Sequence, residues 1–168
     1  MNQILPHSLW IGNAGDGRSP RLLCDLEIEA VFQLATDEPI PVLPREMMLI
    51  RVPITDGVGN SPERMEFAVS TLAHLIQNKR KTLVCCSAGA SRSPAVAACA
   101  LSRVTGQSPQ ECLTLIHKHH PTDVAPGLSY QAVEKPTSCR FFNRREIRGL
   151  ISLANSRRGR HEFVRFHP

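Results

Sequence analysis

The chain has 168 residues, of which 42% are hydrophobic and 21% are charged, a balance typical of one globular domain that excludes a mostly disordered chain. No apolar run approaches the roughly 20 residues that a membrane-spanning helix needs, so we expect no span. The net charge of +5 is concentrated in residues 136–168, which hold eight arginines and two glutamates, whereas residues 1–135 hold twelve basic and thirteen acidic residues. The body is nearly neutral and only the tail is basic.

Short apolar runs alternate with segments that begin with a Ser-Pro pair. In chain order we expect a strand at Ser8–Ile11, a helix opening at Ser19-Pro20, strands at Ala30–Leu34 and Met48–Pro53, a helix from Ser61-Pro62 to about Asn78, a strand at Thr82–Cys85, and helices opening at Ser93-Pro94 and Ser108-Pro109. Each serine is an expected N-cap and each proline an expected first helical residue. Glu111 completes a capping box with Ser108. The alternation predicts an α/β fold with a central, mostly parallel sheet flanked by helices.

The last expected strand runs into a loop of small residues that ends in an arginine: Cys86-Ser87-Ala88-Gly89-Ala90-Ser91-Arg92. Ligands of such folds bind beyond the carboxyl ends of the strands, where this loop lies. Small side chains let the loop curl, so that its N–H groups form an anion nest at a helix N-terminus. Arg92 can add a bidentate fork to a phosphoryl group, and the same donors favour a thiolate at Cys86. The loop thus predicts a nucleophile beside a phosphate cradle.

Cys86-x5-Arg92 followed by Ser93 resembles the signature of the cysteine-dependent protein phosphatases, and AGASRSP is similar to its form in the dual-specificity branch. The resemblance covers about residues 4–135. LPHSLWIGNAGD is similar to the opening strand of that branch, VPITDGVGN to its general-acid loop, and Ser108–Tyr130 to the segment after its phosphate loop. It implies a protein tyrosine phosphatase-like fold, with a catalytic domain over residues 1–135, which leaves a basic C-terminal extension over 136–168.

The resemblance also implies a role for each matching residue. Cys86 would attack phosphorus and form a phosphocysteine, while Arg92 and the amides of residues 87–92 would hold the phosphoryl oxygens. Asp56, thirty residues before Cys86, matches the aspartate that protonates the leaving oxygen. Ser93 matches the hydroxyl that helps to release the sulfur. Neither a metal nor a cofactor is implied.

The implied substrate is a phosphorylated protein, carrying phosphotyrosine, phosphoserine or phosphothreonine, or a small phosphomonoester. The loop carries no lysine, which favours a protein substrate over highly anionic inositol phosphates. Three alternatives stay open: a catalytically weakened phosphate-binding module, a sulfur-transfer or arsenate-reducing enzyme with the same cradle, and a nucleic-acid binder that acts through the tail.

Two positions depart from the family pattern. Cys85 stands where the family has a histidine that organises the loop, and a neutral thiol is a poor hydrogen-bond donor. We therefore expect weaker turnover near neutral pH. The family often has an asparagine, after the last capped helix, that braces the loop; the corresponding DVAPGLSYQ segment offers Gly127 or Ser129 instead.

Each candidate residue also has a purely structural interpretation. Cys86 could be a buried core cysteine, Arg92 a helix-start arginine paired with a carboxylate, and Asp56 a turn former before glycine. His117 and His120 lie one helical turn apart, but a third metal ligand is not evident, so a solvated or phosphate-facing basic edge is favoured.

The six cysteines are scattered, without the density of a disulfide scaffold, and the N-terminus lacks a secretory signal pattern. Both features favour a reducing, cytoplasmic compartment. For the tail we favour a docked terminal helix with a solvated basic face. Attachment to an acidic protein, an anionic membrane surface or nucleic acid is the alternative, and thin aromatic interleaving disfavours nucleic acid.

Overall fold

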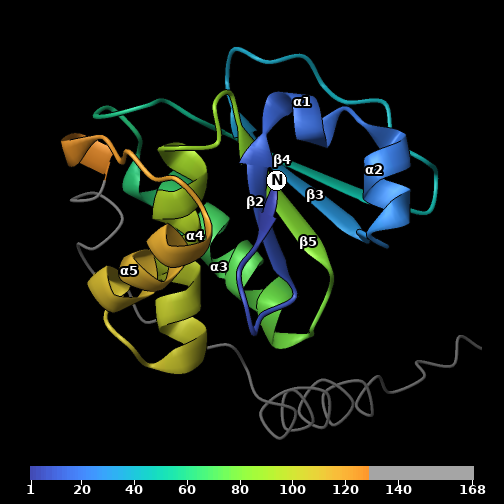
Figure 1. The fold of residues 1–168 in the computed structure, drawn as a ribbon. Coiled ribbons are helices and arrows are strands. Elements are labelled where there is room, and N and C mark those ends of the chain that lie inside the picture. The colour runs from blue at the N-terminus through green and yellow to red at the C-terminus, as the bar shows by residue number, and fades with distance from the viewer. Residues whose placement is uncertain (129–168) are drawn as a thin grey trace, which may run out of the picture. The chain divides into compact units, whose positions relative to one another are not determined.

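The computed structural model describes residues 1–128, and Ser129 and the basic extension lie outside the described residues. Its centre is a five-stranded sheet with the order β1-β2-β5-β3-β4 (Figure 1). The strands are β1 (Asn2–Gln3), β2 (Leu9–Asn13), β3 (Ala30–Ala35), β4 (Met48–Ile54) and β5 (Thr82–Cys86). β2, β5, β3 and β4 pair in parallel, and β1 is antiparallel to β2. The predicted α/β fold with a mostly parallel sheet is confirmed, with β1 as an unpredicted edge strand.

The helices are α1 (Ala14–Gly17), α2 (Pro20–Asp25), α3 (Pro62–Gln77), α4 (Arg92–Thr105) and α5 (Pro109–His119). Three Ser-Pro pairs open helices at the predicted residue, and the Ser108–Glu111 capping box is present. The prediction of Ser93 as an N-cap is wrong. The preceding loop curls so tightly that helical backbone already begins at Arg92, and the Ser91 carbonyl accepts from the Ala95 N–H. Pro94 fits inside the first turn, where its missing N–H has no intrahelical acceptor.

Helices cover both faces of the sheet, α1 and α2 on one and α3, α4 and α5 on the other (Figure 1). The larger core, beneath α3 to α5, includes Phe32, Leu72, Val96 and Ile116. The smaller core, beneath α1 and α2, consists of Trp10, Leu23, Ile28, Val31, Leu83 and Cys85. Because side chains alternate along a strand, the adjacent residues Cys85 and Cys86 belong to different cores.

Within residues 1–128, no helix combines the length and apolar character needed to cross a membrane. Over the same residues, no group of three or more His, Cys, Asp or Glu side chains is arranged to hold a metal ion. Five cysteines are described as free thiols, of which Cys24 is exposed and the others, Cys85, Cys86, Cys99 and Cys112, are buried.

Candidate phosphate-binding site

The loop between β5 and α4 is held by its carbonyl groups. The Ser87 carbonyl accepts from the Ala14 N–H at 3.1 Å, and that of Ala90 from the Asp123 N–H at 2.8 Å. The carbonyl of Gly89 lies 3.1 Å from Nε2 of His120. By contrast, the structure gives the N–H groups of residues 88–91 no acceptor within residues 1–128. Because neighbouring segments bind the carbonyl groups of the loop, its N–H groups are available to bind an anion.

Gly89 is required by this tight path. Its φ is +84°, and a Cβ there would lie 2.7 Å from the carbonyl oxygen of Gly12 in β2. Any side chain would therefore push the loop off the sheet, in addition to its backbone strain. The small residues that the sequence places in the loop are thus needed for its close approach to β2.

Cys86 ends β5 at the start of this loop and is 2% exposed. Cys85 is also buried, but its thiol packs into the smaller core under α1, where a Cβ added to Gly17 would lie 2.9 Å from its Sγ. Burial, followed by the proximity of Cys86, raises the pKa of Cys85 to about 12. Cys85 is therefore a neutral thiol at physiological pH. It lies on the face of the sheet that α1 and α2 cover, opposite the face that α4 covers.

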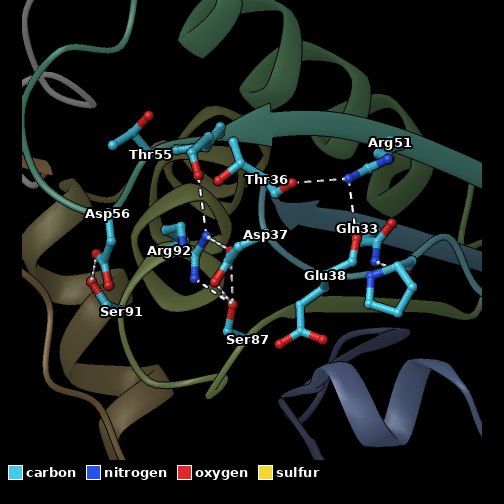
Figure 2. A network of polar contacts seen from close by, with 12 residues as sticks. Gln33, Thr36, Asp37, Glu38, Arg51, Thr55, Asp56, Ser87, Ser91 and Arg92 are labelled. Carbon is cyan, nitrogen blue, oxygen red and sulfur yellow. Dashed lines mark hydrogen bonds and ion pairs between the residues drawn. The ribbon is translucent and has the colours of Figure 1, made fainter.

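Arg92 spans the far end of the loop, with its side chain only 7% exposed. Its Nη2 donates to Ser87 Oγ at 2.7 Å, and its Nη1 donates to the Ile54 carbonyl at 3.3 Å and to Asp37 Oδ1 at 3.2 Å (Figure 2). Its Nε is buried without a hydrogen-bond partner in the described part of the chain, as is Oγ of Ser93. Arg92 thus pairs with a carboxylate, that of Asp37, as the structural interpretation of this residue expects. The guanidinium also donates to Ser87 in the loop, and its Nε has no acceptor within residues 1–128.

Asp56 lies in the exposed segment between β4 and α3. Its Oδ1 accepts from Ser91 Oγ at 2.6 Å, which brings the carboxylate to the edge of the loop (Figure 2). The buried side chain of Asn60 ties this segment together: it accepts from the Thr55 N–H at 2.8 Å and donates to the carbonyls of Thr55 at 2.9 Å and Gly57 at 3.2 Å. The fold therefore assembles all the site residues expected from the sequence around one loop.

The segment after α5, where the sequence lacks the expected asparagine, makes three hydrogen bonds to the loop. Its contributions are the His120 ring and the Asp123 N–H, described above, and the Ala125 N–H, which donates to Ser91 Oγ at 3.2 Å. Two of the three donors are backbone N–H groups, which every residue except proline carries, so these two contacts could not be predicted from residue types. The interpretation of the histidine cluster as an edge facing the loop fits His120, whereas His117 contacts Thr122 Oγ1 at 2.7 Å.

Comparisons with protein-family models and with curated protein sequences found no match. Solved structures do match. Human DUSP28 has a TM-score of 0.70 at 22% identity, over 79% of this chain and 92% of that chain. DUSP15 has a TM-score of 0.65 at 25% identity, over 79% and 84%. A mouse putative dual-specificity phosphatase, solved with zinc tungstate, has a TM-score of 0.70 at 22% identity, over 91% and 89%.

The chain therefore has the fold of the cysteine-dependent phosphatase superfamily. Within that superfamily its fold is that of the dual-specificity phosphatases, which confirms the resemblance at the level of the fold.

Proposed function

We propose that this protein hydrolyses phosphomonoesters through a phosphocysteine intermediate. The observation that carries the proposal is the loop between β5 and α4: it has a thiol at its first residue, a buried guanidinium at its end and, between them, N–H groups that have no acceptor within residues 1–128. Such an arrangement suits a nucleophile that attacks the centre of a bound tetrahedral anion. The proposed catalytic unit is residues 1–135; the role of residues 136–168 and a cytoplasmic location stay predictions.

In the first step the Cys86 thiolate attacks phosphorus, so that an S–P bond forms while the P–O ester bond breaks. The carboxyl group of Asp56 gives its proton to the departing ester oxygen. Arg92 and the loop N–H groups hold the three equatorial oxygens as charge spreads over them. In the second step a water attacks phosphorus and loses its proton to Asp56, the P–S bond breaks, and the Ser93 hydroxyl donates a hydrogen bond to the departing thiolate.

We propose a phosphorylated protein or a small phosphomonoester as the substrate, with phosphotyrosine, phosphoserine and phosphothreonine all open. The similar mouse phosphatase was solved with zinc tungstate, and tungstate is a tetrahedral oxyanion like phosphate. This likeness supports a cradle of the same kind in the present chain and makes tungstate a suitable probe for it.

Rapid mixing with an aryl phosphate tests the proposal. The wild type should release one equivalent of phenol in a burst, Cys86→Ser should show no burst, and Cys85→Ala, which changes the neighbouring thiol on the other face of the sheet, should keep it. Asp56→Asn should lower turnover by about 10²–10⁴-fold for a poor leaving group and much less for a good one. A wild type that binds tungstate but shows no burst would instead favour the second candidate function, a phosphate-binding module. That candidate is supported by Cys85, which stands where the family has a histidine.

A further inference from the structure

Asp37 is one of the residues at this site that lie outside the phosphatase signature Cys86-x5-Arg92. It follows β3, and its carboxylate contacts both ends of the loop: Oδ1 lies 3.2 Å from Nη1 of Arg92, and Oδ1 and Oδ2 lie 3.1 Å and 3.2 Å from Ser87 Oγ. Its side chain is 65% exposed, whereas that of Arg92 is 7% exposed. The carboxylate thus stands at the open side of a buried guanidinium.

The turn that carries Asp37 is fixed by two strand residues. Gln33 in β3 and Arg51 in β4 are direct partners in the sheet. Arg51 Nη2 donates to the carbonyls of Thr36 at 3.2 Å and Glu38 at 3.1 Å, one on each side of Asp37 (Figure 2). Nε2 of the buried Gln33 donates to the Pro39 carbonyl at 2.9 Å. Because the backbone is held on both sides, Asp37 keeps its place beside Arg92.

Asp37 is a counter-ion of Arg92 that stays negatively charged at neutral pH. Bonds from its own backbone N–H, from Arg92 and from Ser87 lower the pKa of Asp37 below its ordinary value, so the carboxylate is ionised at neutral pH. A phosphoryl group bound by the loop would share Arg92 with this carboxylate. Each further negative charge on the substrate near the ester would be repelled by it, and residues 87–91 contain no lysine or second arginine to offset that repulsion.

We propose that Asp37 is a specificity-determining residue, which selects phosphomonoesters whose only strong negative charge is the phosphoryl group itself. The preferred substrates are then phosphorylated side chains in neutral or basic surroundings, and multiply phosphorylated molecules or phosphopeptides with acidic neighbours are disfavoured. This inference rests on the proposed function for turnover, but its first consequence concerns the binding of an anion alone.

The test uses the full chain and tungstate, titrated by calorimetry at neutral pH and fixed ionic strength. Asp37→Asn keeps an oxygen that can accept from Arg92 and Ser87 but removes the charge, so tungstate should bind about tenfold more tightly than to the wild type. Glu38→Gln is the matched control: it removes one charge at the next residue, whose carboxylate pairs with Arg18 at 2.6 Å, and should change the affinity by less than about twofold. Asp37→Ser should behave like Asp37→Asn, and a thermal melt checks that each variant is folded.

A second measurement compares kcat/KM for a phosphopeptide with neutral neighbours and for the same peptide with two flanking glutamates. The wild type should prefer the neutral peptide, Asp37→Asn should reduce that preference by about tenfold, and Glu38→Gln should keep it. Unchanged or weaker tungstate binding in folded Asp37→Asn, or an equal gain in Glu38→Gln, overturns the inference even if the wild type shows its burst. A tighter tungstate complex in Asp37→Asn without any burst in the wild type overturns the proposed turnover and leaves the counter-ion role standing.

Discussion

The imidazole ring of His120 joins the loop between β5 and α4 to the N-terminal strand, with its Nε2 3.1 Å from the Gly89 carbonyl oxygen. Its Nδ1 lies 3.1 Å from Nδ2 of Asn2 in β1. An amide nitrogen can only donate, so Nδ1 accepts and Nε2 carries the proton that is donated to Gly89. A neutral ring in one tautomer thus braces a loop that lacks the histidine usual at position 85.

His120→Ala should weaken tungstate binding and lower kcat/KM by about threefold to tenfold, the equivalent of roughly 0.5–1.5 kcal/mol for one lost hydrogen bond. His120→Gln can still donate to the carbonyl of Gly89 and should recover part of the loss. His119→Ala is the control, because His119 makes no hydrogen bond to the loop among the described residues. Equal effects of His119→Ala and His120→Ala would contradict the bracing role.

The same ring predicts a pH dependence of stability. Burial lowers the pKa of His120 below its ordinary value of 6.5, and the bond to Gly89 opposes this only partly. The unfolded chain therefore binds more protons than the folded one as the pH falls through about 6.5, and stability is lost on acidification. Urea unfolding between about pH 7.5 and pH 5 should show a smaller loss for His120→Gln than for the wild type. Burial lowers the pKa of His7 as well, but His7 contributes equally to both proteins; parallel profiles would show that His120 does not titrate as argued.

Cys85 should be chemically silent although it adjoins the proposed nucleophile. Its pKa is raised to about 12, so at neutral pH it presents almost no thiolate to an alkylating reagent. Peptide mapping after brief treatment of the native protein with iodoacetamide should find Cys24, which is exposed, modified well before Cys85. Cys85→Ala should lower the free energy of unfolding by roughly 1 kcal/mol through lost packing, without loss of the burst. Modification of Cys85 as fast as Cys24 would show that its burial is not maintained in solution.

The elements of this fold could be predicted because their signals are local. Thr82–Cys86 is an apolar run next to a loop of small residues, and Ser108-Pro109 with Glu111 marks a helix start within four residues. The start of α4 could not be predicted in the same way. Whether Ser91 or Ser93 caps that helix depends on how tightly the loop curls against β2, and the contact of Gly89 with Gly12 lies far outside any local window.

The particular contacts that complete the site could not be predicted, for a related reason. Asp37 lies 55 positions from Arg92, and His120 lies 31 positions from Gly89. Asp37 stands at the carboxyl end of β3, and β3 pairs with β5 in the sheet, so knowledge of the strand order would have placed it beside the loop. The sequence predicted the strands but not their order, so the contacts of Asp37 with Arg92 and Ser87 could not be predicted from it.

Asn60 should control the position of Asp56 without touching the substrate. Its amide holds the backbone of Thr55 and Gly57 on both sides of Asp56, and the residue is 6% exposed. Asn60→Ala leaves these backbone groups without their partner and should lower stability by roughly 1–3 kcal/mol. It should also lower kcat for a phenyl phosphate more than for an ester with a good leaving group, the pattern that is expected of Asp56→Asn.

Asn60→Asp sharpens that test. The carboxylate still accepts from the Thr55 N–H, but its second oxygen faces the carbonyls of Thr55 and Gly57 and is repelled by them, so its kcat for a poor leaving group should be at least as low as that of Asn60→Ala. If both Asn60 variants lose activity equally for good and poor leaving groups, Asn60 supports the fold rather than the placement of the acid.

Gly127 contacts the segment between β4 and α3, which carries Asp56, and should help to position it. A Cβ at Gly127 would clash with Cγ1 of Val58 and lie 3.2 Å from its backbone nitrogen, so the chain after α5 packs directly against the segment that carries Asp56. Gly127→Ala should displace that segment and lower kcat several-fold for a poor leaving group, with little change in tungstate affinity, since the loop itself is not touched.

The side chain of Val58 is 72% exposed, so Val58→Ala alone should be nearly neutral. The double variant Gly127→Ala/Val58→Ala removes the clashing methyl and should recover much of the lost kcat, a coupling that a double-mutant cycle measures directly. If the two changes were simply additive, Gly127→Ala would be acting elsewhere than through Val58. A positive coupling would show that the segment carrying Asp56 is positioned by contact with the chain after α5, which also holds the loop between β5 and α4.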